Sequence, residues 1–78
     1  MHNNKIALTI EEASNYTGIG RNTMRDLVKW EKIPVLKIGR KVIIKTETLE
    51  KFIELNENRN LRKRDEVIKV SDEKNEDA

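Results

Sequence analysis

The sequence predicts an α+β fold that is mainly α, a winged helix-turn-helix with a two-stranded β-hairpin between its second and third helices. Two amphipathic helical patterns are separated only by a turn at residues 18–20, which is the spacing of a helix-turn-helix. The apolar pattern then changes from helical to strand-like after Ile33-Pro34, and a third helical pattern follows Thr46. A chain of 78 residues has room for one small domain of this kind.

The first helix is expected to begin at Ile10 and to end at Gly18. Leu8 precedes Thr9-Ile10-Glu11-Glu12, which has the spacing of a capping box. In that motif the Thr9 hydroxyl accepts from the backbone N–H of Glu12, and the Glu12 carboxylate accepts from the N–H of Thr9. Gly18 can end the helix because it adopts the left-handed conformation without a Cβ clash.

The second helix is expected to follow Gly20 directly. Met24, Leu27 and Val28 recur at i, i+3 and i+4 and predict its buried side, with Ile19 filling the corner between the two helices. At about 100° per residue, a narrow arc roughly opposite this stripe contains Asn22, Arg25 and Lys29. The second helix would therefore present one amide and two cations on its outward side.

The hairpin is predicted from residues 35–38 and 41–45, which are rich in β-branched residues and are joined at Gly39-Arg40. Its tip would be basic, with Arg40 and Lys41. Thr46 or a neighbour is expected to cap a third helix. That helix would bury Leu49, Phe52 and Ile53 and close the core over the hairpin.

The periodicity fades after residue 58, and the predicted organisation is a polar leader at 1–7, a domain at 8–58 and a charged tail at 59–78. The tail begins with the basic run 59–64 and becomes acidic, and such composition is typical of a disordered segment. Val67, Ile68 and Val70 are an apolar cluster within it, either tolerated there or folding on a partner. Truncation after residue 58 should then leave the domain intact.

Charge is concentrated in the middle of the chain, where residues 19–45 carry eight Lys and Arg against two acidic residues. This suits a polyanionic partner, and the alternative is a solvated surface rich in lysine. The chain has no cysteine, which fits a reducing cytoplasm, and it shows neither a signal peptide nor a stretch apolar enough to span a membrane.

The sequence offers nothing that predicts catalysis. It has no Gly-Lys-Ser/Thr phosphate loop, no cysteine nucleophile and no histidine near a pair of carboxylates. His2 is isolated, so no metal site can be built from it. We therefore expect no enzyme, no catalytic residue, no cofactor and no bound metal.

Several short motifs, in order, resemble the excisionase family of small winged-helix DNA-binding proteins, which is related to the DNA-binding heads of MerR-type regulators. The resemblance covers about residues 6–57. It is carried by residues 8–13, Gly18-Ile19, Thr23, Ile33-Pro34, Lys37-Ile38-Gly39-Arg40, Leu49 and Phe52. Three positions depart from the family pattern: Thr17 replaces a leucine, Gly20 a capping serine, and Glu31 the glycine that usually ends the second helix. Because glutamate resists a left-handed conformation, the family pattern does not determine how the second helix ends near Trp30.

The resemblance implies that the partner is double-stranded DNA, with the second helix in the major groove. Asn22 could then bond to adenine and Arg25 to guanine, although either residue could instead contact phosphate. The implied contacts from the second helix are Arg21, Asn22, Thr23, Arg25 and Lys29. Those from the wing and its flank are Lys37, Arg40 and Lys41, with Thr9 and Lys32 as further phosphate candidates.

The resemblance also implies a recombination directionality factor that binds beside an attachment site and assists excision of a mobile element. Its partners would be a tyrosine recombinase (integrase) and neighbouring copies of itself on DNA, with no membrane partner. The protein would be bacterial or phage-derived, cytoplasmic and associated with the nucleoid. Two alternatives remain open: a small transcription regulator, and a protein-interaction adaptor that does not bind DNA. RNA binding is less favoured, because a sheet surface rich in base-stacking aromatic residues is missing.

Overall fold

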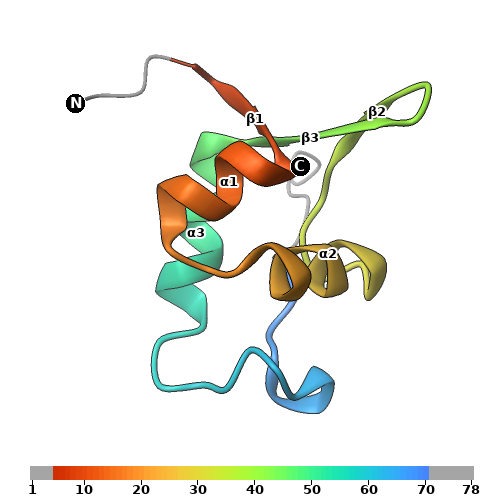
Figure 1. The fold of residues 1–78 in the computed structure, drawn as a ribbon. Coiled ribbons are helices and arrows are strands. Elements are labelled where there is room, and N and C mark those ends of the chain that lie inside the picture. Colours follow the sequence, from red (N-terminus) through yellow and green to blue (C-terminus); the bar gives the residue numbers. More distant parts are fainter. Residues whose placement is uncertain (1–4, 71–78) are drawn as a thin grey trace, which may run out of the picture.

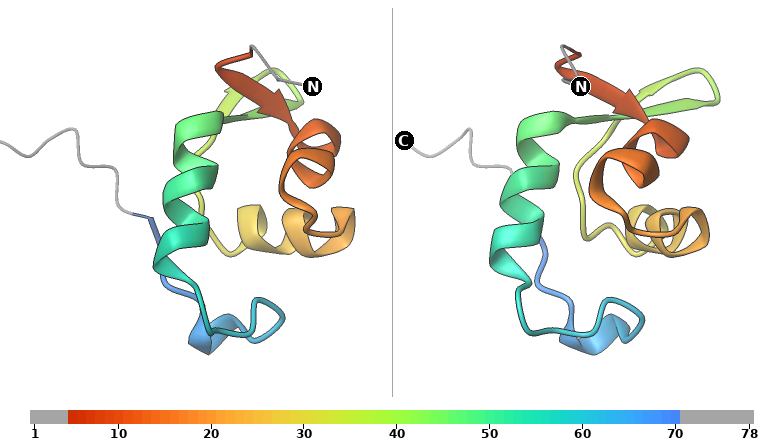
Figure 2. Two further views of the ribbon diagram at one scale, coloured as in Figure 1. Left: turned by 90° about the vertical axis from the view of Figure 1, so that its left-hand side faces the viewer. Right: turned by 60° about the vertical axis from the view of Figure 1, so that its left-hand side comes forward.

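The structure is a computed structural model that describes residues 5–70, and it confirms the predicted α+β fold (Figure 1). The elements follow one another in the order β1 (Ala7–Thr9), α1 (Ile10–Thr17), α2 (Arg21–Lys29), β2 (Leu36–Ile38), β3 (Lys41–Lys45) and α3 (Thr46–Leu55), followed by the short 3₁₀ turn η1 (Arg64–Glu66). The sheet lies at one end of the molecule and the three helices lie below it (Figures 1 and 2).

The sheet has three antiparallel strands in the order β1-β3-β2, one strand more than the predicted hairpin. The additional strand, β1, pairs with β3 so that Leu8 lies opposite Ile44, and both side chains are fully buried. The backbone N–H of Thr46 donates to the carbonyl of Ile6 over 2.9 Å. The expected leader therefore ends earlier than residue 7, because Ala7 already belongs to the sheet.

Helix α1 begins and ends as predicted. The N–H of Glu12 donates to the Thr9 hydroxyl over 3.1 Å, and the N–H of Thr9 donates to the Glu12 carboxylate over 3.0 Å. Gly18 is left-handed with φ 82, and its N–H donates to the carbonyl of Ser14. An ion pair with Lys5, together with the N–H of Thr9, holds the pKa of Glu12 below its ordinary value of 4.5. This contribution to stability is therefore present above that value and is lost as the pH falls through the lowered pKa.

The core forms where the sheet meets the helices, and it differs in two details from the expected packing. Leu49 and Phe52 of α3 are buried as predicted, whereas Ile53 remains 41% exposed. The N-cap of α3 is Lys45, the neighbour of Thr46, and it makes no side-chain capping bond. Thr46 is the first helical residue, and its hydroxyl donates to the carbonyl of Lys5. The buried apolar side chains are Leu8, Ala13, Met24, Leu27, Ile33, Ile44, Leu49, Phe52, Val67 and Val70.

The segment after α3 folds back on the domain, which corrects the expected boundary at residue 58. Asn56 is only 5% exposed, and its side-chain amide donates to the carbonyl of Ile68 and accepts from the N–H of Ile68, at 3.1 and 2.7 Å. Val67 and Val70 are each 4% exposed, and the N–H of Val70 donates to the carbonyl of Lys32. Figure 2 shows this segment returning beside α3. The apolar cluster of the expected tail thus completes the protein's own core, while residues 71–78 lie outside the described part.

Truncation after residue 58 should therefore destabilise the domain, contrary to the expectation from sequence. Loss of the two buried valines alone should lower the free energy of unfolding by about 3 kcal/mol, because burial of each side chain contributes roughly 1.5 kcal/mol. It also leaves the buried amide of Asn56 without its Ile68 partners. Urea unfolding followed by circular dichroism checks this, with truncation after Val70 as the matched control because it keeps every described contact. Equal urea midpoints for the two truncated chains would contradict the assignment of residues 59–70 to the folded core.

Candidate nucleic-acid interface

The turn between α1 and α2 is closed by side-chain hydrogen bonds. The Thr17 hydroxyl donates to the carbonyl of Ala13 over 2.8 Å and accepts from the N–H of Ile19 over 3.1 Å. The Ser14 hydroxyl donates to the carbonyl of Ile19 over 2.7 Å. Ile19 is half-buried against the core, as predicted for the corner residue. At Thr17, where the family usually has leucine, the side chain therefore holds the turn through hydrogen bonds and not through apolar packing.

Helix α2 turns its apolar side to the core and its polar side to solvent. Met24 and Leu27 are fully buried, whereas Asn22, Arg25 and Lys29 are exposed, as the helical arc predicts. Of the other two candidates on this helix, Arg21 is exposed and Thr23 is half-buried in the first turn. Gly20 occupies the N-cap position and supplies no side-chain bond there.

Asp26 belongs to the same outward side, and sequence reasoning missed it. It is exposed and lies four residues after Asn22, hence one helical turn further along the same face. At about 100° per residue, Asp26 falls about 40° beyond Asn22, next to the narrow arc of the three predicted residues, so the helical period could have identified it. A carboxylate in a major groove accepts from the N4 amino group of cytosine. The outward face of α2 therefore carries an amide, two cations and one carboxylate.

Helix α2 ends in a Schellman motif in which glutamate takes the position usual for glycine. Glu31 has φ 61, and its N–H donates to the carbonyl of Val28 over 3.0 Å. The N–H of Lys32 donates to the carbonyl of Leu27, also over 3.0 Å. A left-handed conformation costs a residue with a Cβ about 1–2 kcal/mol. The end of α2 thus has the left-handed geometry that glycine usually provides in the family, in spite of the departure at Glu31.

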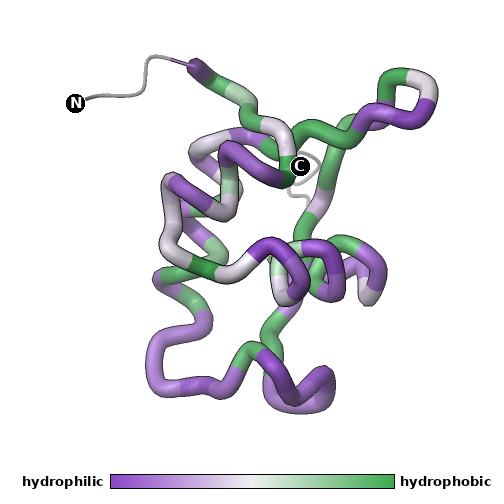
Figure 3. Tube along the Cα trace, viewed as in Figure 1, coloured by the Kyte–Doolittle hydropathy of each residue, from purple (hydrophilic) through white to green (hydrophobic). Residues whose placement is uncertain are grey.

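Strands β2 and β3 and their turn form the wing. Gly39 has φ 62 at the first turn position and Arg40 has none of that strain, which is the pattern of a type II′ turn. Lys37 lies opposite Val42 and Ile38 lies opposite Lys41, so Lys37 and Lys41 are on different faces of the wing. In Figure 3 the wing carries hydrophilic residues near its tip beside apolar strand residues. All three candidates of the wing are exposed, and Lys37 is the one that lines a cleft together with residues of α2.

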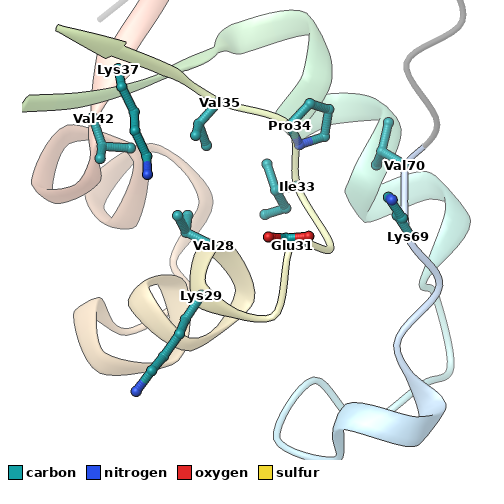
Figure 4. A pocket seen from close by; sticks show the side chains of 10 residues that line it. All are labelled: Val28, Lys29, Glu31, Ile33, Pro34, Val35, Lys37, Val42, Lys69 and Val70. Atoms are coloured by element: carbon teal, nitrogen blue, oxygen red, sulfur yellow. The ribbon is translucent and has the colours of Figure 1, made fainter.

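A cleft separates α2 from the wing, and both elements contribute cations to it. Figure 4 shows Lys37 extending from the wing towards Val28 on α2. The floor is apolar and the polar lining residues are three lysines and one glutamate. The lining residues are Val28, Lys29, Glu31, Ile33, Pro34, Val35, Lys37, Val42, Lys69 and Val70.

Two predicted phosphate contacts lie outside this cleft. Thr9 is the N-cap of α1, where its hydroxyl already accepts from Glu12, and it lies opposite Ile43 in the sheet. Lys32 is half-buried and its backbone bonds to Leu27 and Val70. Of the predicted site residues, the structure therefore brings Lys29 and Lys37 together at the cleft. The other candidates of α2, Arg40 and Lys41 at the wing tip, and Thr9 and Lys32 are not among its lining residues.

The cations of the interface are available to an external anion. The ion pairs within residues 5–70 are Lys5–Glu12 and Lys45–Glu47, so none of them involves a cation of α2 or of the cleft.

In the same part of the chain no three His, Asp or Glu side chains gather as metal ligands. Nor does any helix of that part have the length and apolar character needed to cross a bilayer.

A family model described as a helix-turn-helix domain matches residues 7–56, which run from β1 to the end of α3. The chain belongs to the helix-turn-helix domain family. That family includes small DNA-binding proteins of the excisionase type, so the resemblance seen in the sequence is confirmed. Neither the search of characterised proteins nor that of solved structures gives a match. As a helix-turn-helix protein, the chain has DNA as its partner, and α2 occupies the position of the recognition helix.

Replacing Glu31 should separate backbone strain from charge in this joint. Glu31→Gly relieves the left-handed strain and should stabilise the protein by roughly 0.5–1 kcal/mol, after allowance for the extra freedom of glycine in the unfolded chain. Glu31→Gln keeps the strain and should leave the urea midpoint unchanged. Both variants remove a carboxylate from the cleft and should bind DNA more tightly. Equal midpoints for the glycine and glutamine variants would show that the joint is not strained.

Proposed function

We propose that this helix-turn-helix protein binds duplex DNA sequence-specifically, with α2 in the major groove and the wing against the adjacent backbone. The observation that carries the proposal is the outward face of α2, where Asn22, Arg25 and Lys29 are exposed beside the cationic cleft. A major groove admits one α-helix and presents a distinct pattern of donors and acceptors for each base pair.

Within α2, position along the helix separates the proposed roles. Asn22 and Arg25 occupy the outward face, where an amide suits adenine and a guanidinium suits guanine. Arg21 and Thr23 lie in the first turn, where the helix dipole favours a phosphate. Lys29, at the end of the helix and on the rim of the cleft, is assigned to the backbone.

In the wing, Lys37 and Arg40 are the proposed contacts with the DNA backbone. Lys37 extends into the cleft and Arg40 stands at the turn, so both can follow a strand that leaves the major groove. Lys41 lies on the opposite face of the wing from Lys37, so we propose that it contributes to DNA binding only through its charge near the wing tip. Thr9 and Lys32, outside the cleft, rank last among the phosphate contacts.

We infer further that the protein acts as a recombination directionality factor, binding beside an attachment site and assisting a tyrosine recombinase in excision. The motifs shared with the excisionase family support this role. After α3 the chain returns to its own domain through Asn56 instead of continuing as a dimerisation helix, which favours single units that bind cooperatively at adjacent sites. The exposed basic residues Arg59, Arg62, Lys63 and Arg64 are candidates for contact with the recombinase or with a neighbouring copy.

The alternative role is that of a small transcription regulator, which the same DNA-binding face would serve. An excision reporter that carries the attachment sites and the cognate integrase, with and without this protein, separates the two roles. The directionality role predicts more excised circle when the protein is present. Unchanged excision, together with DNA binding by the same preparation, would reject that role and favour regulation.

Arg25→Ala and Arg40→Ala should have different effects on DNA recognition. Loss of a guanine contact removes about 1–3 kcal/mol of discrimination, so Arg25→Ala should relax sequence preference. Arg40→Ala should weaken binding to all duplexes alike, because phosphates carry no sequence information. Selection of bound duplexes from a random pool, followed by affinity measurement, checks this, with Lys51→Ala on α3 as the control. The same loss of preference in both arginine variants would contradict the assignment of α2 to the bases.

A further inference from the structure

The segment after residue 56 lies beyond the part of the chain that the family model matches, yet it is firmly attached to the domain. Ile68 is held by both its N–H and its carbonyl to the side chain of Asn56. Val70 is buried, and its N–H is held by the carbonyl of Lys32. Lys69 lies between these two anchored residues, so its backbone position is fixed although its side chain is exposed.

Lys69 reaches the same cleft as the recognition helix and the wing. The residues that line the cleft include Lys29 from α2, Lys37 from β2 and Lys69 from the C-terminal segment, three elements that are far apart in sequence. In Figure 4 the side chain of Lys29 points away from the other lining residues, and Lys69 lies on the other side of Glu31 from Lys37. Glu31 is the acidic residue among the lining side chains, and three cations outnumber it. No ion pair within residues 5–70 engages any of these lysines.

The chemistry of this arrangement fits a chain of phosphates. In the proposed complex, with α2 in the major groove and the wing on the adjacent backbone, the phosphates between these two contacts would pass the cleft that both elements line. Lysine binds phosphate as a flexible point charge that needs no fixed geometry. The apolar floor of Val28, Val35 and Val42 offers no competing hydrogen bonds, so the rim cations determine what binds.

We propose that Lys69 binds a phosphate of the DNA strand between α2 and the wing, which makes the C-terminal segment part of the DNA-binding surface. This inference rests on the proposed DNA binding by α2 and the wing. It extends that surface to an element outside the family domain. The segment then has two roles, because the residues that flank Lys69 complete the core while Lys69 itself meets the ligand.

The test compares Lys69→Gln with wild type and with Lys51→Gln, an exposed lysine of α3 outside the cleft. Fluorescence anisotropy with a labelled duplex of arbitrary sequence gives the affinity between roughly 50 and 200 mM salt. Each lost phosphate contact lowers the slope of log K against log salt by about 0.9, which corresponds to roughly eightfold weaker binding at 0.1 M salt. We expect this loss for Lys69→Gln, equally for duplexes of different sequence, and no loss for Lys51→Gln.

The possible failures can be told apart. If wild type binds no duplex, the proposed function itself fails. If wild type binds and Lys69→Gln matches it in affinity and slope, only the role of Lys69 is overturned. A loss confined to one DNA sequence also overturns it, since that is the behaviour of a base contact. Thermal unfolding of the variant should equal that of wild type, because the exposed Lys69 side chain has no partner within residues 5–70.

Discussion

The left-handed backbone at Glu31 is the constraint on which the arrangement of the interface depends. Its N–H and that of Lys32 bond back to the last turn of α2, which reverses the chain and directs Ile33 into the core. The carbonyl of Lys32 then accepts from Val70. One joint of two residues thereby sets where α2 ends, where the wing begins and where the C-terminal segment lies. The burial of Ile33 and these hydrogen bonds offset the strain of the left-handed conformation at Glu31, which glycine would adopt without strain.

A second constraint follows from the small size of the domain and its few aromatic side chains. A domain of this length buries a modest share of its surface, and here Val67 and Val70 supply part of the core from outside the family-matched region. The buried amide of Asn56 makes this possible by satisfying both backbone groups of Ile68, which would otherwise be costly to bury. In the proposed complex, stability and DNA recognition are coupled, because the segment that closes the core also places Lys69 at the cleft.

The features that could be predicted from the sequence depend on interactions between residues that are close together in the chain. The capping box joins residues three apart, the left-handed Gly18 ends α1, and the arc of α2 follows from helical geometry alone. The features that were missed depend on distant partners: β1 is a strand only because Leu8 meets Ile44, and the return of the C-terminal segment depends on a bond between Asn56 and Ile68. The position of Asp26 and the opposite faces of Lys37 and Lys41 were within reach, since periods of about 3.6 and 2 determine them. At Glu31 the sequence identified the joint, but only tertiary packing determines that glutamate accepts the left-handed conformation.

The central claim is that DNA contacts one continuous surface made by α2, the wing and the C-terminal segment. Titration of ¹⁵N-labelled protein with a duplex, followed by amide and lysine side-chain chemical shifts, tests it most directly. We expect the largest changes at residues 21–29, at residues 37–41 and at Lys69, with little change along the exposed side of α3. Changes concentrated on α3, or α2 left unaffected by saturating duplex, would contradict it.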